Sequence, residues 1–139
     1  MSEKFMSDYN KATGGNVMVA RNGLHAAMAE LSHVNFKVLM ALVLTVGYQG
    51  AEVCISHSKV AKQLHVSRKS VINAAKTLAS KGLVKQRRDG NDCWYRVSPW
   101  LAWQGNFGMQ YEAMHKWQTC EPWVKDAEDS APVSQEAGR

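Results

Sequence analysis

The side chains best suited to chemistry lie between Ser56 and Val97, and they are mostly cationic, amide or hydroxyl groups. Arg68, Lys69 and Asn73 occur close together at the start of a segment with helical periodicity. An arginine or lysine can bond a guanine edge or a phosphate, and an asparagine can pair with an adenine edge. These residues favour recognition of duplex DNA by hydrogen bonds and ion pairs.

The candidate DNA contacts form three groups with different expected roles. The first group lies on a predicted recognition helix, whose N-terminal residues would enter the major groove. Its members are Ser67, Arg68, Lys69, Ser70, Asn73, Lys76 and Thr77. The second group lies on a basic hairpin, or wing, that would follow the backbone or the minor groove. Its members are Lys85, Arg87, Arg88 and Asn91. The third group would contact the DNA backbone and comprises Ser56, Ser58 and Lys59.

Two helices and a hairpin are needed to position these groups. Ser56 and Ser58 are both candidate N-caps for a helix that runs to Leu64, and Ser67 caps a second helix over residues 68–81 that Gly82 closes. Strands over residues 83–88 and 93–97 flank a turn at residues 89–92, where Asp-Gly is a strong hairpin signal. This order predicts a winged helix-turn-helix.

The apolar pattern of this unit supports the same fold. Ala61 is small enough to let the first helix lie close to the second. Val66, Val71, Ala75 and Leu78 then form one apolar face, which leaves the opposite, polar face of the second helix for DNA.

The rest of the chain predicts an α+β fold that is mainly helical, with an extra N-terminal helix and a C-terminal aromatic helix. The expected elements are a short strand within residues 16–21, a turn at Asn22-Gly23, helices over residues 24–33 and 34–46, a strand over residues 53–55, and an amphipathic helix over residues 100–117. We expect a flexible N-terminus (1–15), one DNA-binding domain (16–119) and an acidic disordered tail (120–139).

The charge is distributed unevenly along the chain. The net charge of the whole chain is +5, yet residues 56–98 contain ten basic and two acidic residues, and residues 120–139 carry −3. A basic field concentrated in one supersecondary unit favours a polyanionic partner.

Other classes of protein find little support in the sequence. Cys54, Cys93 and Cys120 are odd in number and widely spaced, so we expect reduced thiols and neither a disulfide nor a structural zinc site. No nucleotide-binding loop, metal-ligand cluster or nucleophile arrangement is present, so we expect no enzyme activity and no cofactor. The longest apolar run, residues 38–46, is too short for a membrane span, and residues 1–10 do not resemble a secretory signal, so we expect a cytoplasmic protein.

The sequence is also compatible with dimerisation and with protein binding. A homodimer is plausible because helix-turn-helix proteins often pair on repeated half-sites, and residues 24–33 or 100–117 would form the contact. The aromatic residues of the second segment would either close the core or form a partner surface. A winged-helix module that binds protein instead of DNA is a further alternative.

The chain resembles the RepL-type plasmid replication proteins, small winged-helix initiators of bacterial plasmids, over about residues 16–106. The resemblance rests on NVMVARNGLHAAMAEL, NFKVLMALVL, ISHSKVAKQLHVSRKSVINAAKTLASKGLV and YRVSPWLAWQGN. Similar proteins follow the wing with a tyrosine, an Asn-Pro step, an aromatic residue and a glycine; Tyr95, Trp103 and Gly105 fit, whereas Ser98-Pro99 departs. The resemblance implies binding at a plasmid or phage replication origin and recruitment of host replication proteins. A transcription regulator with the same DNA-binding unit is the alternative.

Overall fold

The structure of the chain, a computed structural model, describes residues 3–117 apart from the side chains of Met6, Tyr9 and Asn10. The described residues form an α+β fold that is more helical than stranded, as expected. In chain order the elements are α1 (Glu3–Thr13), β1 (Met18–Val19), α2 (Arg21–Glu30), α3 (His33–Val43), β2 (Val53–Ile55), α4 (His57–Leu64), α5 (Arg68–Ser80), β3 (Val84–Asp89), β4 (Asp92–Val97), β5 (Ala102–Trp103) and α6 (Phe107–Lys116).

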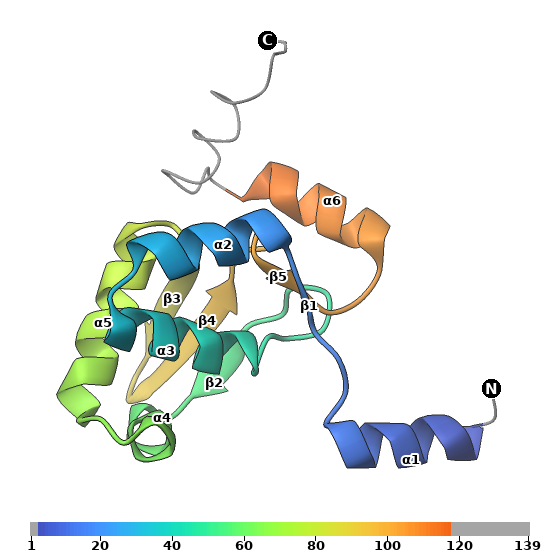
Figure 1. Cartoon of the computed structure of the whole chain (residues 1–139), viewed down its shortest axis with the longest axis horizontal. Helices are drawn as coiled ribbons and strands as arrows, with labels where there is room; N and C mark the ends of the chain where they lie inside the picture. Colours follow the sequence, from blue (N-terminus) through green and yellow to red (C-terminus); the bar gives the residue numbers. More distant parts are fainter. Residues whose placement is uncertain (1–2, 118–139) are drawn as a thin grey trace, which may run out of the picture.

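Helices α3, α4 and α5 pack with a three-stranded antiparallel sheet of order β2-β4-β3 around one hydrophobic core. Figure 1 shows α2 and α3 in front of this sheet, with α5 along one side and α4 at the lower end. The most extensive helix–helix contact joins α3 to α5. Its buried residues include Val38, Leu39 and Leu42 on α3, and Val71 and Leu78 on α5.

The predicted signals at the ends of α4 and α5 are confirmed. The hydroxyl of Ser56, not that of Ser58, accepts a hydrogen bond from the amide of Lys59 and caps α4. The hydroxyl of Ser67 accepts from the amide of Ser70 and caps α5. Gly82 follows α5 with φ +75°, a left-handed conformation that glycine adopts without a steric penalty.

The predicted hairpin is also present, with a turn shorter than expected. Its strands pair from Val84 with Val97 to Asp89 with Asp92, so only Gly90 and Asn91 connect them. Gly90 has φ +62°, which suits the first position of a tight two-residue hairpin turn. The predicted strand over residues 53–55 is β2, which pairs with the other edge of β4.

The N-terminal third differs from the prediction at three places. α1 occupies most of the segment expected to be a flexible lead-in, and it lies to one side of the rest of the chain (Figure 1). The predicted turn at Asn22-Gly23 is wrong, because both residues belong to the first turn of α2. A Cβ at Gly23 would meet Leu101 Cδ1 at 3.1 Å and the carbonyl oxygen of Trp100 at 3.3 Å, so this glycine permits close packing. His33 begins α3, because Ser32 caps that helix by accepting from the amide of Asn35.

The C-terminal segment is not one helix over residues 100–117. Ala102 and Trp103 form β5, which pairs with Val19 and Met18 of β1, the strand expected within residues 16–21. Trp103 is buried, and its indole N–H donates to the carbonyl of Asn106. The side chain of Asn106 then caps α6. The predicted acidic tail, and Cys120 with it, lies outside the described residues, and Cys54 and Cys93 are free thiols.

Two leucines of the α3 segment provide a matched test of this packing. Leu39 is 0% exposed, whereas Leu44, directly after the helix, is 81% exposed. Leu39→Ala should lower the free energy of unfolding by about 2–5 kcal/mol, because it leaves a cavity in the core. Leu44→Ala should change it by less than about 0.5 kcal/mol. Urea unfolding of both variants checks this, and equal losses would contradict the packing described.

Candidate nucleic-acid interface

One side of α5 presents the polar side chains predicted to contact DNA. Lys69, Asn73 and Lys76 are exposed and recur every three or four residues, so they share one face of the helix. Val71, Ala74, Ala75 and Leu78 occupy the buried face. Arg68 is exposed at the first position of the helix. The structure thus brings the cationic and amide members of the first group together.

The hydroxyl members of that group are engaged within the helix. Ser67 caps α5, and its hydroxyl lies 2.8 Å from the hydroxyl of Ser70. The hydroxyl of Thr77 donates to the carbonyl of Asn73 over 3.2 Å. Ser67 and Ser70 therefore fix the start of α5, next to Arg68 and Lys69.

The start of α4 lies beside this region. Ser56, Ser58 and Lys59 are all exposed there, as the third group of contacts requires. His57 is the first residue of α4, and its Nε2 lies 2.8 Å from the hydroxyl of Tyr95 on β4.

The β3–β4 hairpin divides its charged residues between two faces. Successive strand residues point to opposite sides of a sheet, and residues paired across strands share a side. Tyr95 is buried, so its partner Gln86, and the next pair, Arg88 with Cys93, lie on the inner face of the sheet. Lys85 and Arg87 lie on the outer face, opposite Arg96 and Trp94. The four predicted hairpin contacts are therefore not equivalent: Arg88 shares the side of α5, Lys85 and Arg87 do not, and Asn91 is exposed at the turn.

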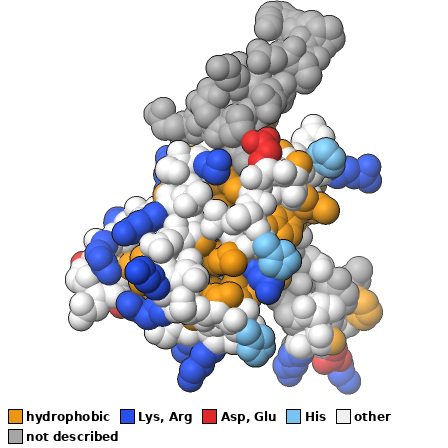
Figure 2. Space-filling view, turned by 60° about the vertical axis from the view of Figure 1, so that its left-hand side comes forward, with side chains coloured by type: hydrophobic (Ala, Val, Ile, Leu, Met, Phe, Trp, Pro, Cys, Tyr) orange, Lys and Arg blue, Asp and Glu red, His pale blue; other side chains and the backbone are white. Residues whose placement is uncertain are grey.

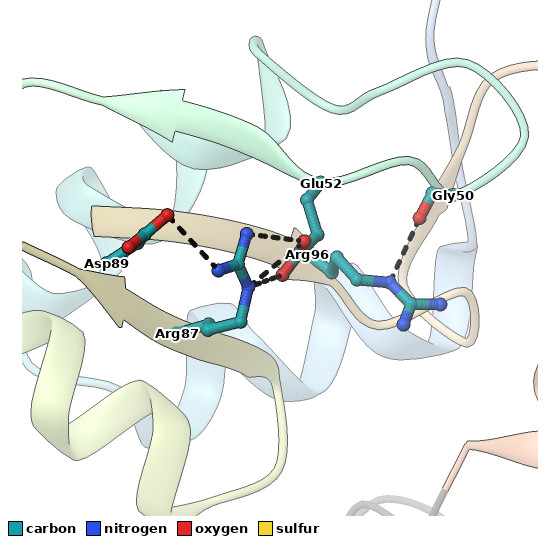
Figure 3. A network of polar contacts seen from close by, with 5 residues as sticks. All are labelled: Gly50, Glu52, Arg87, Asp89 and Arg96. Carbon is teal, nitrogen blue, oxygen red and sulfur yellow. Dashed lines mark hydrogen bonds and ion pairs between the residues drawn. The ribbon is translucent and has the colours of Figure 1, made fainter. Parts of the chain in front are cut away.

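Arg87 is held on the outer face by a two-pronged ion pair (Figure 3). Its Nε and Nη2 each donate to the Glu52 carboxylate over 3.0 Å, and Nη1 lies 4.0 Å from Asp89. The hydrogen bond from Arg87 lowers the pKa of Glu52 and raises that of Arg87 itself. The guanidinium also lies 5.6 Å from the centre of the Trp94 ring. In the same network Arg96 Nε donates to the carbonyl of Gly50 over 3.0 Å.

Trp117, the residue after α6, covers more of the outer face. The Lys85 ammonium lies 4.4 Å, and the Arg96 guanidinium 5.8 Å, from the centre of its ring. Its indole N–H donates to the carbonyl of Gly82 over 3.0 Å. Both predicted contacts of the outer face, Lys85 and Arg87, thus have partners within the chain.

A cavity of about 220 Å³ separates α5 from the inner face of the hairpin. The residues that line it come from α4, α5, β3 and β4 and are His57, Ile72, Lys76, Gln86, Arg87, Arg88, Cys93 and Tyr95. Arg87 contributes to this lining although its guanidinium pairs with Glu52 on the outer face. Lys76 and Arg88 face the same space from opposite walls, although twelve positions separate them in the sequence. Figure 2 shows Lys and Arg side chains gathered at the left of a view that brings the α5 side forward.

The pKa values of His57 and Tyr95 in this cavity differ from the ordinary values of these side chains. Burial lowers the pKa of His57, and the positive charges of Arg68 and Arg88 lower it further. Burial raises the pKa of Tyr95 to about 12, so its hydroxyl keeps its proton at neutral pH. His57 is therefore mainly uncharged at neutral pH and sits between cations of α5 and β3.

His57, Gln86 and Tyr95 are further polar groups at this surface, and they do not belong to the three groups predicted from the sequence. The strand alternation from Val84, a core residue, could have placed Gln86 and Arg88 inward. The contact of His57 with Tyr95 spans 38 positions, and no sequence signal indicates it.

The chain matches no protein-family model and no curated protein to a significant degree. Within residues 3–117 no group of three or more His, Cys, Asp or Glu side chains could hold a metal ion. None of the helices in that range is long and apolar enough to cross a membrane.

Two residues that carry the RepL resemblance have structural roles here. Trp103 is buried, and Gly105 has φ +131°, where a Cβ would collide with the Gln49 side chain. That side chain accepts a hydrogen bond from the amide of Asn106. These residues shape the loop between β5 and α6.

The titration of His57 tests the geometry of the cavity. NMR of the free protein should give His57 a pKa below 6.5, and Arg68→Gln should raise it towards that value by removing a positive charge. The pKa of His57 is lower in the folded state than in the unfolded chain. As the pH falls through 6.5 the unfolded chain therefore takes up this proton before the folded one does, and the free energy of unfolding decreases. A pKa of His57 at or above 6.5 in the wild-type protein would contradict the burial described.

Proposed function

We propose that this chain is a sequence-specific double-stranded DNA-binding protein that acts through a winged helix-turn-helix. In this proposal α4 and α5 are the two helices, α5 is the recognition helix, and the β3–β4 hairpin is the wing. The observation that carries the proposal is the shared surface of α5 and the inner face of the hairpin, where Lys76 and Arg88 line one cavity. Cationic side chains from separate elements lie together beside an exposed polar helix face. Such a surface suits duplex DNA, because its phosphates are anionic and its base edges carry hydrogen-bond donors and acceptors.

The roles of the α5 residues follow from their positions. Arg68 and Lys69, at the exposed N-terminal end, would enter the major groove and bond guanine edges or phosphates. Asn73, one turn further, would pair with an adenine edge. Ser56, Ser58 and Lys59, at the start of α4, would contact the neighbouring backbone.

Selection of bound duplexes from a random pool tests the proposal directly. We expect an enriched motif, and Arg68→Ala should weaken binding to it by about 1–3 kcal/mol if the guanidinium reads a base. Arg21→Ala, which removes an exposed arginine at the start of α2, is the matched control and should have little effect. Absence of salt-dependent affinity for any duplex would overturn the proposal and favour a protein-binding module.

The two faces of the hairpin give a second test. Arg88→Gln should reduce the slope of log affinity against log salt by about one, because it removes a phosphate contact. Arg87→Gln should leave that slope nearly unchanged, because Arg87 lies on the outer face and pairs with Glu52. Titrations of a random-sequence duplex at several salt concentrations measure both slopes. An equal reduction for the two variants would show that the outer face also contacts DNA.

Within this class we propose that the chain initiates replication of a plasmid or phage by binding its origin. The support is the RepL resemblance, which also implies host replication proteins as partners. A second copy of this chain is a separate proposed partner, because helix-turn-helix proteins often pair on repeated half-sites. A transcription regulator would use the same residues. A plasmid that carries only this gene and its flanking DNA separates the two roles, because replication in a permissive host is expected of an initiator alone.

A further inference from the structure

The cavity between α5 and the hairpin combines two kinds of lining. Ile72 and the ring of the buried Tyr95 provide apolar surface, whereas Lys76 and Arg88 provide positive charge. At about 220 Å³ the cavity has room for several water molecules. Its ligand should therefore be a group of several atoms with both an apolar and an anionic part.

The geometry of duplex DNA supplies such a group at this place. The sugar–phosphate backbone is the wall that divides the major groove from the minor groove. If α5 enters the major groove and the hairpin follows the adjacent minor groove, one strand must pass between them. The cavity lies between these two elements, and a deoxyribose with its phosphate has the required apolar and anionic parts.

We propose that this cavity receives one sugar–phosphate unit of the bound DNA, and that His57 takes up a proton when the phosphate enters. The inference rests on the proposed DNA-binding function and adds a specific backbone site and a proton linkage to it. The deoxyribose packs on Ile72 and the Tyr95 ring, and Lys76 and Arg88 approach the phosphate.

The proton uptake follows from the charges around His57. In the free protein the cations Arg68 and Arg88 face His57, and Lys76, Arg87 and the Cys93 thiol also line the cavity. The cations oppose a further positive charge on His57. A phosphate in the cavity reverses this balance, because a nearby anion stabilises the imidazolium form. DNA affinity should then rise as the pH falls through the pKa of His57 in the complex, and level off below its pKa in the free protein.

Tyr95 links the two events. When His57 Nε2 carries no proton, the Tyr95 hydroxyl donates to it. When Nε2 is protonated, it donates to the Tyr95 oxygen instead. The Tyr95 O–H bond can then rotate towards the cavity and donate a hydrogen bond to a phosphate oxygen. Because burial holds the pKa of Tyr95 at about 12, the hydroxyl keeps this proton throughout the relevant pH range.

The first experiment measures the affinity of the full chain for a random-sequence duplex at constant salt, between about pH 5.5 and about pH 7.5. We expect the affinity to rise roughly three- to tenfold towards acid pH, which corresponds to a shift in pKa of up to about one unit on binding. His57→Gln should remove this rise. His25→Gln on α2, which lies outside the cavity, should retain it.

The second experiment uses the wild-type protein and does not depend on the folding of a variant. NMR titration of His57, free and bound to the same duplex, should give a higher pKa in the complex. Duplex binding with an unchanged or lower His57 pKa would overturn the cavity proposal and leave the proposed DNA-binding function intact. Failure to bind any duplex would overturn both.

Discussion

The seating of α5 on α3 is the contact on which the rest of the structure depends. Val71, Ala74, Ala75 and Leu78 are all at most 2% exposed. The two alanines allow the helix axis to approach its neighbours closely, while Val71 and Leu78 provide apolar area. This packing fixes the rotation of α5 about its axis, and so decides which of its side chains remain in water.

The packing of α5 on α3 also fixes the position of the β3–β4 hairpin, because the hairpin follows directly after α5. Gly82 ends α5, the amide of Leu83 donates to the carbonyl of Leu78, and the amide of Ser98 donates to the carbonyl of Leu83. Once Val84 is buried, strand alternation assigns each following residue to a face. A run of basic residues that looks uniform in the sequence is thereby divided: Arg88 points to the inner face, whereas the guanidinium of Arg87 is held by Glu52 on the outer face.

Local signals made much of this fold predictable, and long-range contacts account for most of the differences. Ser67, Gly82 and the Asp-Gly turn act through neighbouring residues, so the sequence indicated α5 and the hairpin closely. The close approach of Gly23 to Leu101 joins residues far apart in the chain, and so does the pairing of β5 with β1. The contact of His57 with Tyr95 and the cover of Lys85 by Trp117 likewise join distant segments. The assignment of Lys85, Arg87 and Arg88 to the two faces of the hairpin was predictable, because strand residues alternate between faces and Val84 is buried.

Trp117 fixes the end of the described chain to the outer face of the sheet. Its ring lies on Lys85 and Arg96, and its indole holds the carbonyl of Gly82, so the described chain ends against the back of the sheet. That point faces away from the cavity, because paired strand residues alternate between the two faces. The indole of Trp117 therefore ties the end of α6 to the outer face of the sheet, opposite the surface that α5 shares with the hairpin.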